Sequence, residues 1–287
     1  MGASFARSVC DARKHKRLPL LNAATPRFAV PDGLLPLDAE TGKQLASQAL
    51  VAPELLAAVQ RQEHPAFCAA AAATSVTAAH NTGIVSQWNM VEAFQKAKAR
   101  HVFSHYGWHI LDWLPDAVRY PLLRHLLFDG MPMALLAEWF RCQGYLAKVV
   151  SGEFTTAETL REDILQAFSP ARAGEGAAGS SLRGTGFRKY IIVNYSRTAM
   201  GQRMFSGGHY APVGGFHAGD DKVLLLEVNS FRYPSVWVDV RMLANAVATK
   251  VNSGKTWRGY LCITCPPDAG DAGHGAKKHH DMGVSCS

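Results

Sequence analysis

The chain has 287 residues, of which 48% are hydrophobic and 18% are charged. This composition excludes a disordered or fibrous protein and is typical of one large domain or of two lobes that share a cleft. No segment approaches the roughly 18 to 20 uninterrupted apolar residues that a membrane helix needs, so we expect a soluble protein without a membrane partner.

The positive charge is unevenly distributed along the chain. The formal net charge is +7, yet five basic residues and one acidic residue lie before position 18. Nucleic-acid-binding proteins usually spread Lys and Arg over a docking face, so we expect no nucleic-acid partner. We interpret the basic start as a solvated tail, with an organelle transit segment as the alternative. Six cysteines are too few for a disulfide scaffold and favour a reducing, cytoplasmic location.

Composition and periodicity divide the chain into a basic tail with a lead-in segment, a globular domain and a polar tail, at residues 1–35, 36–265 and 266–287. Within the domain we expect a helical lobe, a Gly-, Ala- and Ser-rich surface insert and a sheet lobe, at about residues 36–170, 171–186 and 187–265. The predicted fold class is therefore α+β.

Apolar residues recur at helical spacing through the first half of the domain. The expected helices are two between Asp38 and Gln62, one over Ala69–His80, further helix within residues 101–150, and one ending at Phe168. The segment Thr155–Glu158 has the spacing of a capping box before the last of them. The alanine-rich helix is expected to pack closely on several sides, with Cys68 in its first turn.

Short β-branched or aromatic runs between glycines characterise the second half. They predict strands over Tyr190–Tyr195, His209–Phe216, Val223–Val228 and Tyr260–Ile263, with a short helix around Met242–Thr249. The order is thus a helical half that carries a cysteine at a helix start, followed by a sheet half that carries a histidine.

Cys68 and His209 are the candidate catalytic pair. The partial positive charge at a helix N-terminus favours a thiolate, and so does a neighbouring histidine. His209 follows Gly207 and Gly208 at a predicted strand start, where the small backbone lets a substrate approach closely. The alternative for each residue is a structural role in the core.

A catalytic histidine needs a third group that fixes its orientation. Glu227 ends a predicted strand, and Asn229 lies two residues later on the same face, so either could serve. Acyl transfer also needs donors for the developing oxyanion. The Gln62 side-chain amide and the Cys68 backbone N–H would form such a pair.

Four motifs in this order resemble the phytochelatin synthase family. Gln62–Cys68 resembles Q-x-x-P-A-[YF]-C, and Gly208–Gly215 looks like G-H-[FI]-S-P-[IL]-G-G. Leu224–Trp237 is similar to L-D-V-x-R-[FY]-K-Y-P-x-x-W, and Arg258–Leu261 is similar to a terminal R-G-[FY] strand. The likeness covers most of residues 37–264.

The resemblance implies a papain-like fold, with a helical N-terminal lobe and an antiparallel sheet lobe, and a Cys-His-Asp triad. Such enzymes cleave glutathione at its Cys–Gly bond and pass the γ-glutamylcysteinyl group to a second glutathione or to water, in heavy-metal detoxification. By resemblance, Cys68 is the nucleophile, His209 the general base and Gln62 the oxyanion donor. No resident cofactor is expected. Cadmium or zinc would act as glutathione thiolate complexes or activators, and a homodimer is an alternative to a monomer.

Two departures from the family pattern affect the expected site. Glu227 replaces the family's Asp and is one methylene longer, which leaves Asn229 as the alternative third group. Ser230 replaces an arginine that grips the substrate's γ-glutamyl carboxylate, so the bidentate contact of that arginine is expected to be lost. Arg232 and Arg197 match neighbouring basic positions and are the expected remaining cations for substrate binding, beside Gly208.

Two other patterns have metal-ligand spacing. His101, His105 and His109 recur every four residues, and Cys262 and Cys265 form a single CxxC. Interleaved aromatic residues favour a packed segment for the histidines, and the CxxC has no second half, so we expect no metal site. Two rival hypotheses to the transferase are a glutathione hydrolase or papain-like peptidase, and a catalytically silent homologue that binds without turnover.

Overall fold

The computed structural model describes the chain in seven stretches. These are residues 28–64, 66–80, 86–91, 131–169, 188–202, 207–251 and 254–265. The predictions for most of the N-terminal tail, for the histidines between residues 101 and 109, for the surface insert and for the C-terminal tail lie outside the described residues.

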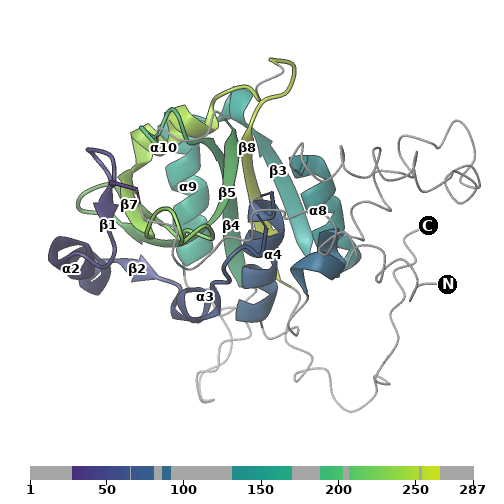
Figure 1. The fold of residues 1–287 in the computed structure, drawn as a ribbon, viewed down its shortest axis with the longest axis horizontal. Coiled ribbons are helices and arrows are strands. Elements are labelled where there is room, and N and C mark those ends of the chain that lie inside the picture. Colours follow the sequence, from purple (N-terminus) through teal and green to yellow (C-terminus); the bar gives the residue numbers. More distant parts are fainter. Residues whose placement is uncertain are drawn as a thin grey trace, which may run out of the picture.

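An antiparallel sheet forms the centre of the fold (Figure 1). The strand order is β1-β7-β6-β5-β4-β8-β3, with β2 paired to β5, and every pair is antiparallel. The strands are β1 Leu35–Pro36, β2 Leu50–Val51, β3 Leu146–Ser151, β4 Lys189–Ser196, β5 Gly208–His217, β6 Lys222–Leu225, β7 Val236–Asp239 and β8 Gly259–Thr264.

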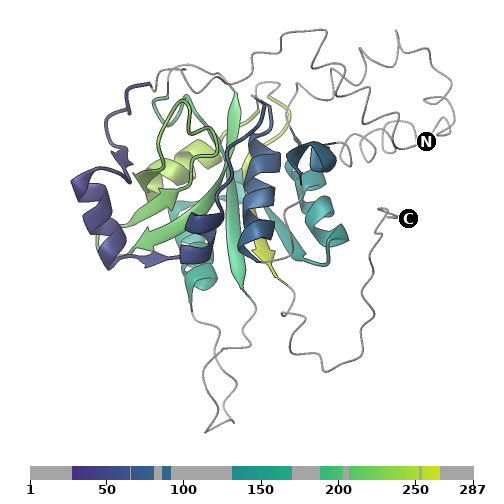
Figure 2. The same cartoon turned by 60° about the horizontal axis from the view of Figure 1, so that its bottom comes forward.

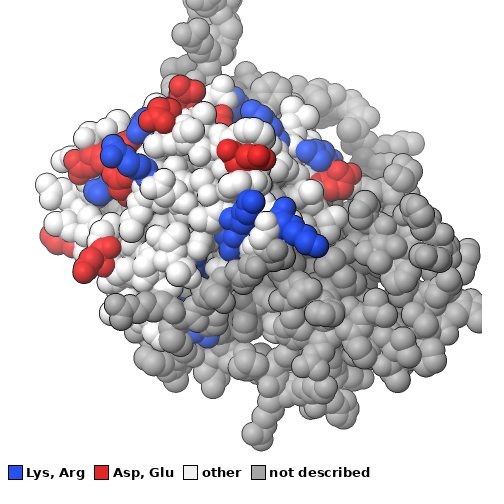
Figure 3. Space-filling model, turned by 90° about the horizontal axis from the view of Figure 1, so that it is seen from above, with Lys and Arg blue, Asp and Glu red and all other residues white. Residues whose placement is uncertain are grey.

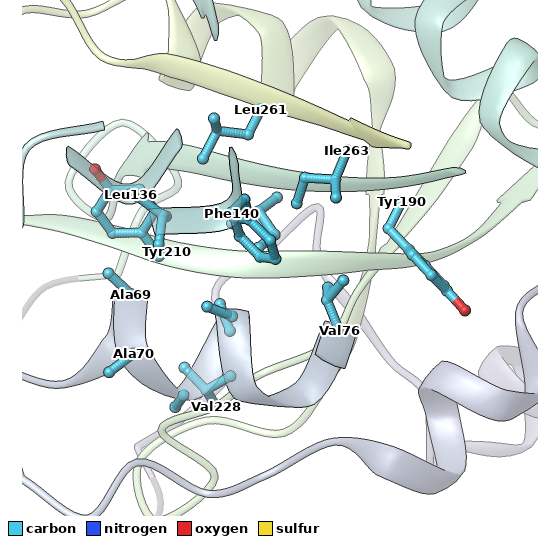
Figure 4. Packing of buried hydrophobic residues seen from close by; sticks show 14 of the residues in the cluster. Ala69, Ala70, Val76, Leu136, Phe140, Tyr190, Tyr210, Val228, Leu261 and Ile263 are labelled. Atoms are coloured by element: carbon cyan, nitrogen blue, oxygen red, sulfur yellow. The ribbon is translucent and has the colours of Figure 1, made fainter. Parts of the chain in front are cut away.

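Helices cover both faces of this sheet, as Figures 1 and 2 show. The described helices are α2 Glu40–Gln48, α3 Pro53–Ala58, α4 Cys68–Ala79, α8 Met133–Cys142, α9 Ala157–Phe168 and α10 Val240–Val247, with a 3-10 turn at Gly152–Phe154. One core cluster joins α4 and α8 to the sheet, and a second joins α9 and α10 to its other face. Figure 4 shows side chains of α4, α8, β5 and β8 packed together in the first cluster, among them Val76, Phe140, Tyr210 and Ile263.

Strand β4 lies between the two cores. Ile192 faces the cluster of α4, while Ile191 and Val193 face the cluster of α9 and α10. A strand that is buried on both faces reads as a continuous apolar run rather than as an alternating one. Within β4, Tyr190–Val193 form such a run.

Helix α4 has almost no solvent-facing side. Its residues from Ala69 to Ala73 are at most 1% exposed, and Thr74, Ser75 and Val76 are fully buried. The hydroxyls of Thr74 and Ser75 donate hydrogen bonds to carbonyls one turn back, so their burial leaves no unpaired donor. Small side chains let α4 approach the sheet closely, and this holds Cys68 at a fixed depth.

The structure confirms most of the predicted elements. Two helices lie between Asp38 and Gln62, α4 begins at Cys68, α9 ends at Phe168, and β4, β5, β8 and α10 match their predicted positions within a few residues. The fold is α+β with an antiparallel sheet. The predicted helical lobe also contributes β1, β2 and β3 to that sheet.

Three local predictions are wrong. Residues from Leu146 form β3 rather than helix, because they pair along β8 in six registered positions from Leu146 to Ser151. The predicted strand to Val228 ends at Leu225. The capping box of α9 lies one residue later than predicted, since Thr156 is the N-cap and exchanges hydrogen bonds with Thr159.

The surface carries both signs of charge. On the face seen in Figure 3, Lys and Arg are interspersed with Asp and Glu. Among the described residues, none of the helices combines the length and the apolar character that crossing a membrane requires.

Candidate active site

Cys68 is the first residue of α4 and lies partly exposed at the helix N-terminus. Its thiol is hydrogen-bonded to His209 and to the backbone N–H of Tyr210. Burial acts to raise the pKa of the thiol, but the contact with His209 and the charge of that ring outweigh burial. The pKa of Cys68 therefore lies below its ordinary value.

His209 is the second residue of β5 and is buried. Its Nε2 lies 2.7 Å from Oε1 of Glu227, and its ring meets the Tyr195 ring edge-on at a centroid distance of 5.6 Å. Burial and the charge of Arg197 act to lower the pKa of His209, while Glu227 and the Cys68 thiol raise it. The net pKa is raised, which favours the protonated ring beside a thiolate.

Glu227 is the carboxylate that reaches the histidine. It is 5% exposed, and its Oε1 also accepts a hydrogen bond from the backbone N–H of Asn229 at 2.7 Å. Of the two candidates for a third group, the structure thus places Glu227 on His209, while Asn229 supports Glu227 through its backbone. Burial would raise the pKa of Glu227, but Arg197 and His209 hold it at about 2, so this carboxylate is ionised.

Arg197 is the last residue in the buried chain of contacts and binds Glu227. Its Nη2 donates to both carboxylate oxygens of Glu227, at 3.0 and 3.1 Å, and its Nη1 donates to Oε1 of Gln202 at 2.5 Å. Only 3% of Arg197 is exposed. Arg197 therefore positions Glu227 in the structure, and its predicted contact with a substrate stays a prediction. Sequence reasoning missed Gln202 because nothing in its local pattern marks it.

Gln62 lies in the loop before α4 and is buried. Its backbone N–H donates to the carbonyl of Val228 at 2.8 Å, and its Nε2 donates to the carbonyl of His64 at 3.1 Å. A side-chain amide has two N–H donors. The bond to His64 therefore fixes the direction of the Gln62 amide beside the start of α4.

A second group of polar side chains surrounds Gly208, directly before His209. The guanidinium of Arg258 packs against this glycine, and Oδ1 of Asn194 lies 2.8 Å from the point that a side-chain Cβ would occupy. Arg258 is 3% exposed, its Nε donates to Thr249, and no described carboxylate pairs with it. Burial lowers the pKa of Arg258.

Asn194 complements this buried cation. Its Oδ1 is buried and has no hydrogen-bond partner among the described residues. No local pattern in the sequence marks Asn194, and Arg258 stands out only as the first residue of the motif at the start of β8. Buried polar groups without partners are uncommon, so this oxygen beside a buried guanidinium calls for an explanation.

The remaining predicted site residues, Ser230 and Arg232, are half-buried. Oγ of Ser230 accepts a hydrogen bond from Nε of Arg61 at 3.1 Å. The guanidinium of Arg232 lies 5.5 Å from the centroid of the Phe28 ring. In the part of the chain that the structure describes, no group of three or more His, Cys, Asp or Glu side chains could hold a metal ion.

The pH dependence of Cys68 reactivity follows from these contacts. We expect iodoacetamide to alkylate Cys68 at pH values well below those needed for an ordinary thiol, because the imidazolium of His209 stabilises the thiolate. Glu227→Gln removes the charge that raises the pKa of His209, so the ring loses its proton at lower pH. The thiolate then loses its partner, and the alkylation profile shifts to higher pH.

The measurement is the alkylation rate as a function of pH, followed by intact mass. Glu227→Asp is the matched control, because it keeps the carboxylate and should shift the profile less. Overlapping profiles for the wild-type protein and Glu227→Gln would show that Glu227 does not control the pair.

Known proteins resemble this chain over the same region. The family model for phytochelatin synthase matches residues 25–260. Glutathione gamma-glutamylcysteinyltransferase 3 of Lotus japonicus is 26% identical over 142 residues, which are 50% of this chain and 26% of that protein. Glutathione gamma-glutamylcysteinyltransferase of Schizosaccharomyces pombe is 33% identical over 75 residues, or 26% of this chain and 18% of the relative.

The matched part thus spans about a quarter or less of the length of these curated relatives. The family model, in contrast, extends from before β1 to within β8 and includes Gln62, Cys68, His209, Glu227 and Arg258. The chain belongs to the phytochelatin synthase family.

Proposed function

We propose that this chain is a glutathione γ-glutamylcysteinyltransferase with a papain-like fold. The observation that carries the proposal is the buried chain of contacts from the Cys68 thiol through His209 and Glu227 to Arg197. A thiol, an imidazole and a carboxylate in this order are the parts of a cysteine acyltransferase or peptidase. The names of the relatives point to glutathione as the peptide.

The proposed reaction has two halves. The Cys68 thiolate attacks the carbonyl carbon of the Cys–Gly bond, and the oxyanion accepts hydrogen bonds from the Gln62 amide and the Cys68 backbone N–H. Protonated His209 gives its proton to the leaving glycine nitrogen, and a γ-glutamylcysteinyl thioester remains on Cys68. Neutral His209 then takes a proton from the amine of a second glutathione, or from water, as that nucleophile displaces the thiolate.

Arg258 and Asn194 are the proposed recognition groups for the γ-glutamyl end of the donor. That end carries a carboxylate and an ammonium on the same carbon. The guanidinium of Arg258 matches the carboxylate, and the unpaired Oδ1 of Asn194 matches the ammonium. This pair supplies a carboxylate site next to His209 that does not depend on residue 230.

Gly208→Ala is expected to impair this subsite. A methyl group there would collide with the Arg258 guanidinium and with Asn194, so the guanidinium must move. We expect the KM for glutathione to rise about tenfold, as for the loss of one charged hydrogen bond. The measurement is steady-state kinetics of glycine release.

Gly207→Ala is the matched control for that variant. Among the described residues, no atom beyond its chain neighbours lies within 4 Å of the position of its added methyl group, so the KM should stay near the wild-type value. Equal effects of the two substitutions would contradict a role for Arg258 and Asn194 in binding.

Hydrolysis of glutathione is the second candidate function, because both outcomes share the same thioester. The choice depends on whether water or a second glutathione reaches the acyl group. Cadmium or zinc would enter as complexes with substrate thiolates.

Mass spectrometry of the products tests the proposal. The protein is incubated with millimolar glutathione, with and without cadmium or zinc. Chains of repeating γ-glutamylcysteine would establish the transferase, and γ-glutamylcysteine with glycine alone would establish the hydrolase. Untouched glutathione in the presence of folded protein would refute both.

A further inference from the structure

Arg61 is an exposed arginine whose side chain is held in place at two points. Its Nε donates to Oγ of Ser230 at 3.1 Å, and its Cζ lies 3.8 Å from the centroid of the Phe231 ring. A free arginine side chain samples many rotamers, so stacking and a hydrogen bond together fix its direction. The guanidinium therefore lies over Phe231 rather than extending into solvent.

This guanidinium lies where two segments of the candidate active site meet. Arg61 directly precedes Gln62, whose backbone N–H donates to the carbonyl of Val228 at 2.8 Å. Ser230 follows Glu227 by three residues. Two hydrogen bonds thus join the loop that leads to Cys68 to the segment that carries Glu227, and here Gln62 is buried while Arg61 is exposed.

The terminal nitrogens of Arg61 remain available. Ser230 engages Nε, and no described carboxylate lies within ion-pair distance of this guanidinium. Nη1 and Nη2 form a planar pair that matches the two oxygens of a carboxylate. A cation that is oriented in advance at the edge of a site binds an anion at a smaller entropic cost than a free side chain does.

We propose that Arg61 is a specificity-determining residue that binds a carboxylate of the peptide substrate. The inference rests on the proposed function, since it concerns the peptide that reaches Cys68. It also changes the expected consequence of Ser230. This serine carries no charge, but it orients a guanidinium that comes from the opposite segment, so cationic recognition at this position is retained.

Equilibrium binding of glutathione to full-length Cys68→Ala protein tests the proposal without turnover. Arg61→Gln in that background is expected to weaken binding about tenfold, the effect of losing one charged hydrogen-bonding group. Arg241→Gln is the matched control, because Arg241 is an exposed arginine on α10 and its loss makes the same change in net charge. Arg61→Lys keeps the charge without the planar pair and should give an intermediate affinity.

Two glutathione analogues identify the carboxylate. One carries an amide at the glycine carboxylate, and the other carries an amide at the γ-glutamyl carboxylate. One of the two analogues lacks the carboxylate that Arg61 binds. This analogue should bind the Arg61→Gln protein and the protein that retains Arg61 with nearly the same affinity. Equal losses for glutathione and both analogues would show that Arg61 acts only on the structure of the loop, and the proposal would be wrong.

The two proposals fail separately. If the wild-type protein turns over glutathione but Arg61→Gln binds like Arg241→Gln, the inference on Arg61 fails and the proposed function stands. If the wild-type protein leaves glutathione intact while Cys68→Ala protein binds it in an Arg61-dependent manner, the proposed activity fails and the role of Arg61 stands. Thermal melting of each variant confirms that the compared proteins are folded.

Discussion

Cys68→Ala is expected to abolish glycine release from glutathione, with a loss of at least about 10³-fold in kcat. Every step of the proposed reaction passes through the thioester on Cys68, and the contact with His209 lowers the pKa of this thiol. The residual rate should equal the uncatalysed rate. The measurement is glycine release and thioester formation, followed by product analysis and intact mass.

Cys262→Ala is the control for this result. Burial raises the pKa of Cys262 to about 12, with Asp163 adding to the shift, so its thiol is protonated at neutral pH. Its removal should leave turnover unchanged. Full activity of Cys68→Ala would exclude both the transferase and the hydrolase.

Arg197→Gln is expected to lower the free energy of unfolding by about 3 to 5 kcal/mol. The substitution leaves the Glu227 carboxylate buried without its cation, and the side chains of both partners are only 4% exposed. Turnover should fall as well, because Arg197 holds the carboxylate that orients His209. Urea unfolding followed by tryptophan fluorescence measures the change in stability.

The exposed pair of Arg161 and Asp221 provides the comparison. Both Arg161 nitrogens lie 2.7 Å from the Asp221 oxygens, but the two side chains are 32% and 36% exposed. Arg161→Gln should therefore cost at most about 1 kcal/mol. Equal losses in the free energy of unfolding for the two substitutions would show that burial does not make the Arg197–Glu227 pair more important for stability than the exposed pair, and the prediction would be wrong.

The buried pair also makes the free energy of unfolding depend on pH at acidic values. The pKa of Glu227 is about 2 in the folded protein against an ordinary value of 4.5. The ionised carboxylate thus stabilises the fold above the ordinary pKa, and this stabilisation is lost as the pH falls toward about 2. In Arg197→Gln the folded pKa rises, so the same loss should begin at higher pH.

The parts of the fold that were predictable are those that local pattern specifies. Strand β4 contains the apolar run Tyr190–Val193, and α4 begins with five consecutive alanines after Cys68, the strongest helix formers. Strands β1 and β2 have two residues each and exist only through pairing with β7 and β5. No periodicity can appear in two residues, so the sequence contains no signal for them.

The same distinction holds within the site. Local context marks Cys68 at a helix start and His209 at a glycine-flanked strand start, and it leaves Glu227 and Asn229 as alternatives for the third group. Asn194 becomes relevant only because strand register places it opposite Gly259 on β8, next to Arg258. The contact of Arg61 with Ser230 joins residues 169 positions apart, and only the folded chain brings them together.

The buried alanine helix that begins at Cys68 has a consequence for the variation that this protein can tolerate. Ala70, Ala71, Ala72 and Ala73 are fully buried, so a larger side chain at any of them would meet atoms already in contact. Substitutions at exposed positions away from the site usually change stability little. The helix that places the nucleophile offers no such freedom, and accepted substitutions there should be confined to side chains of nearly the same volume.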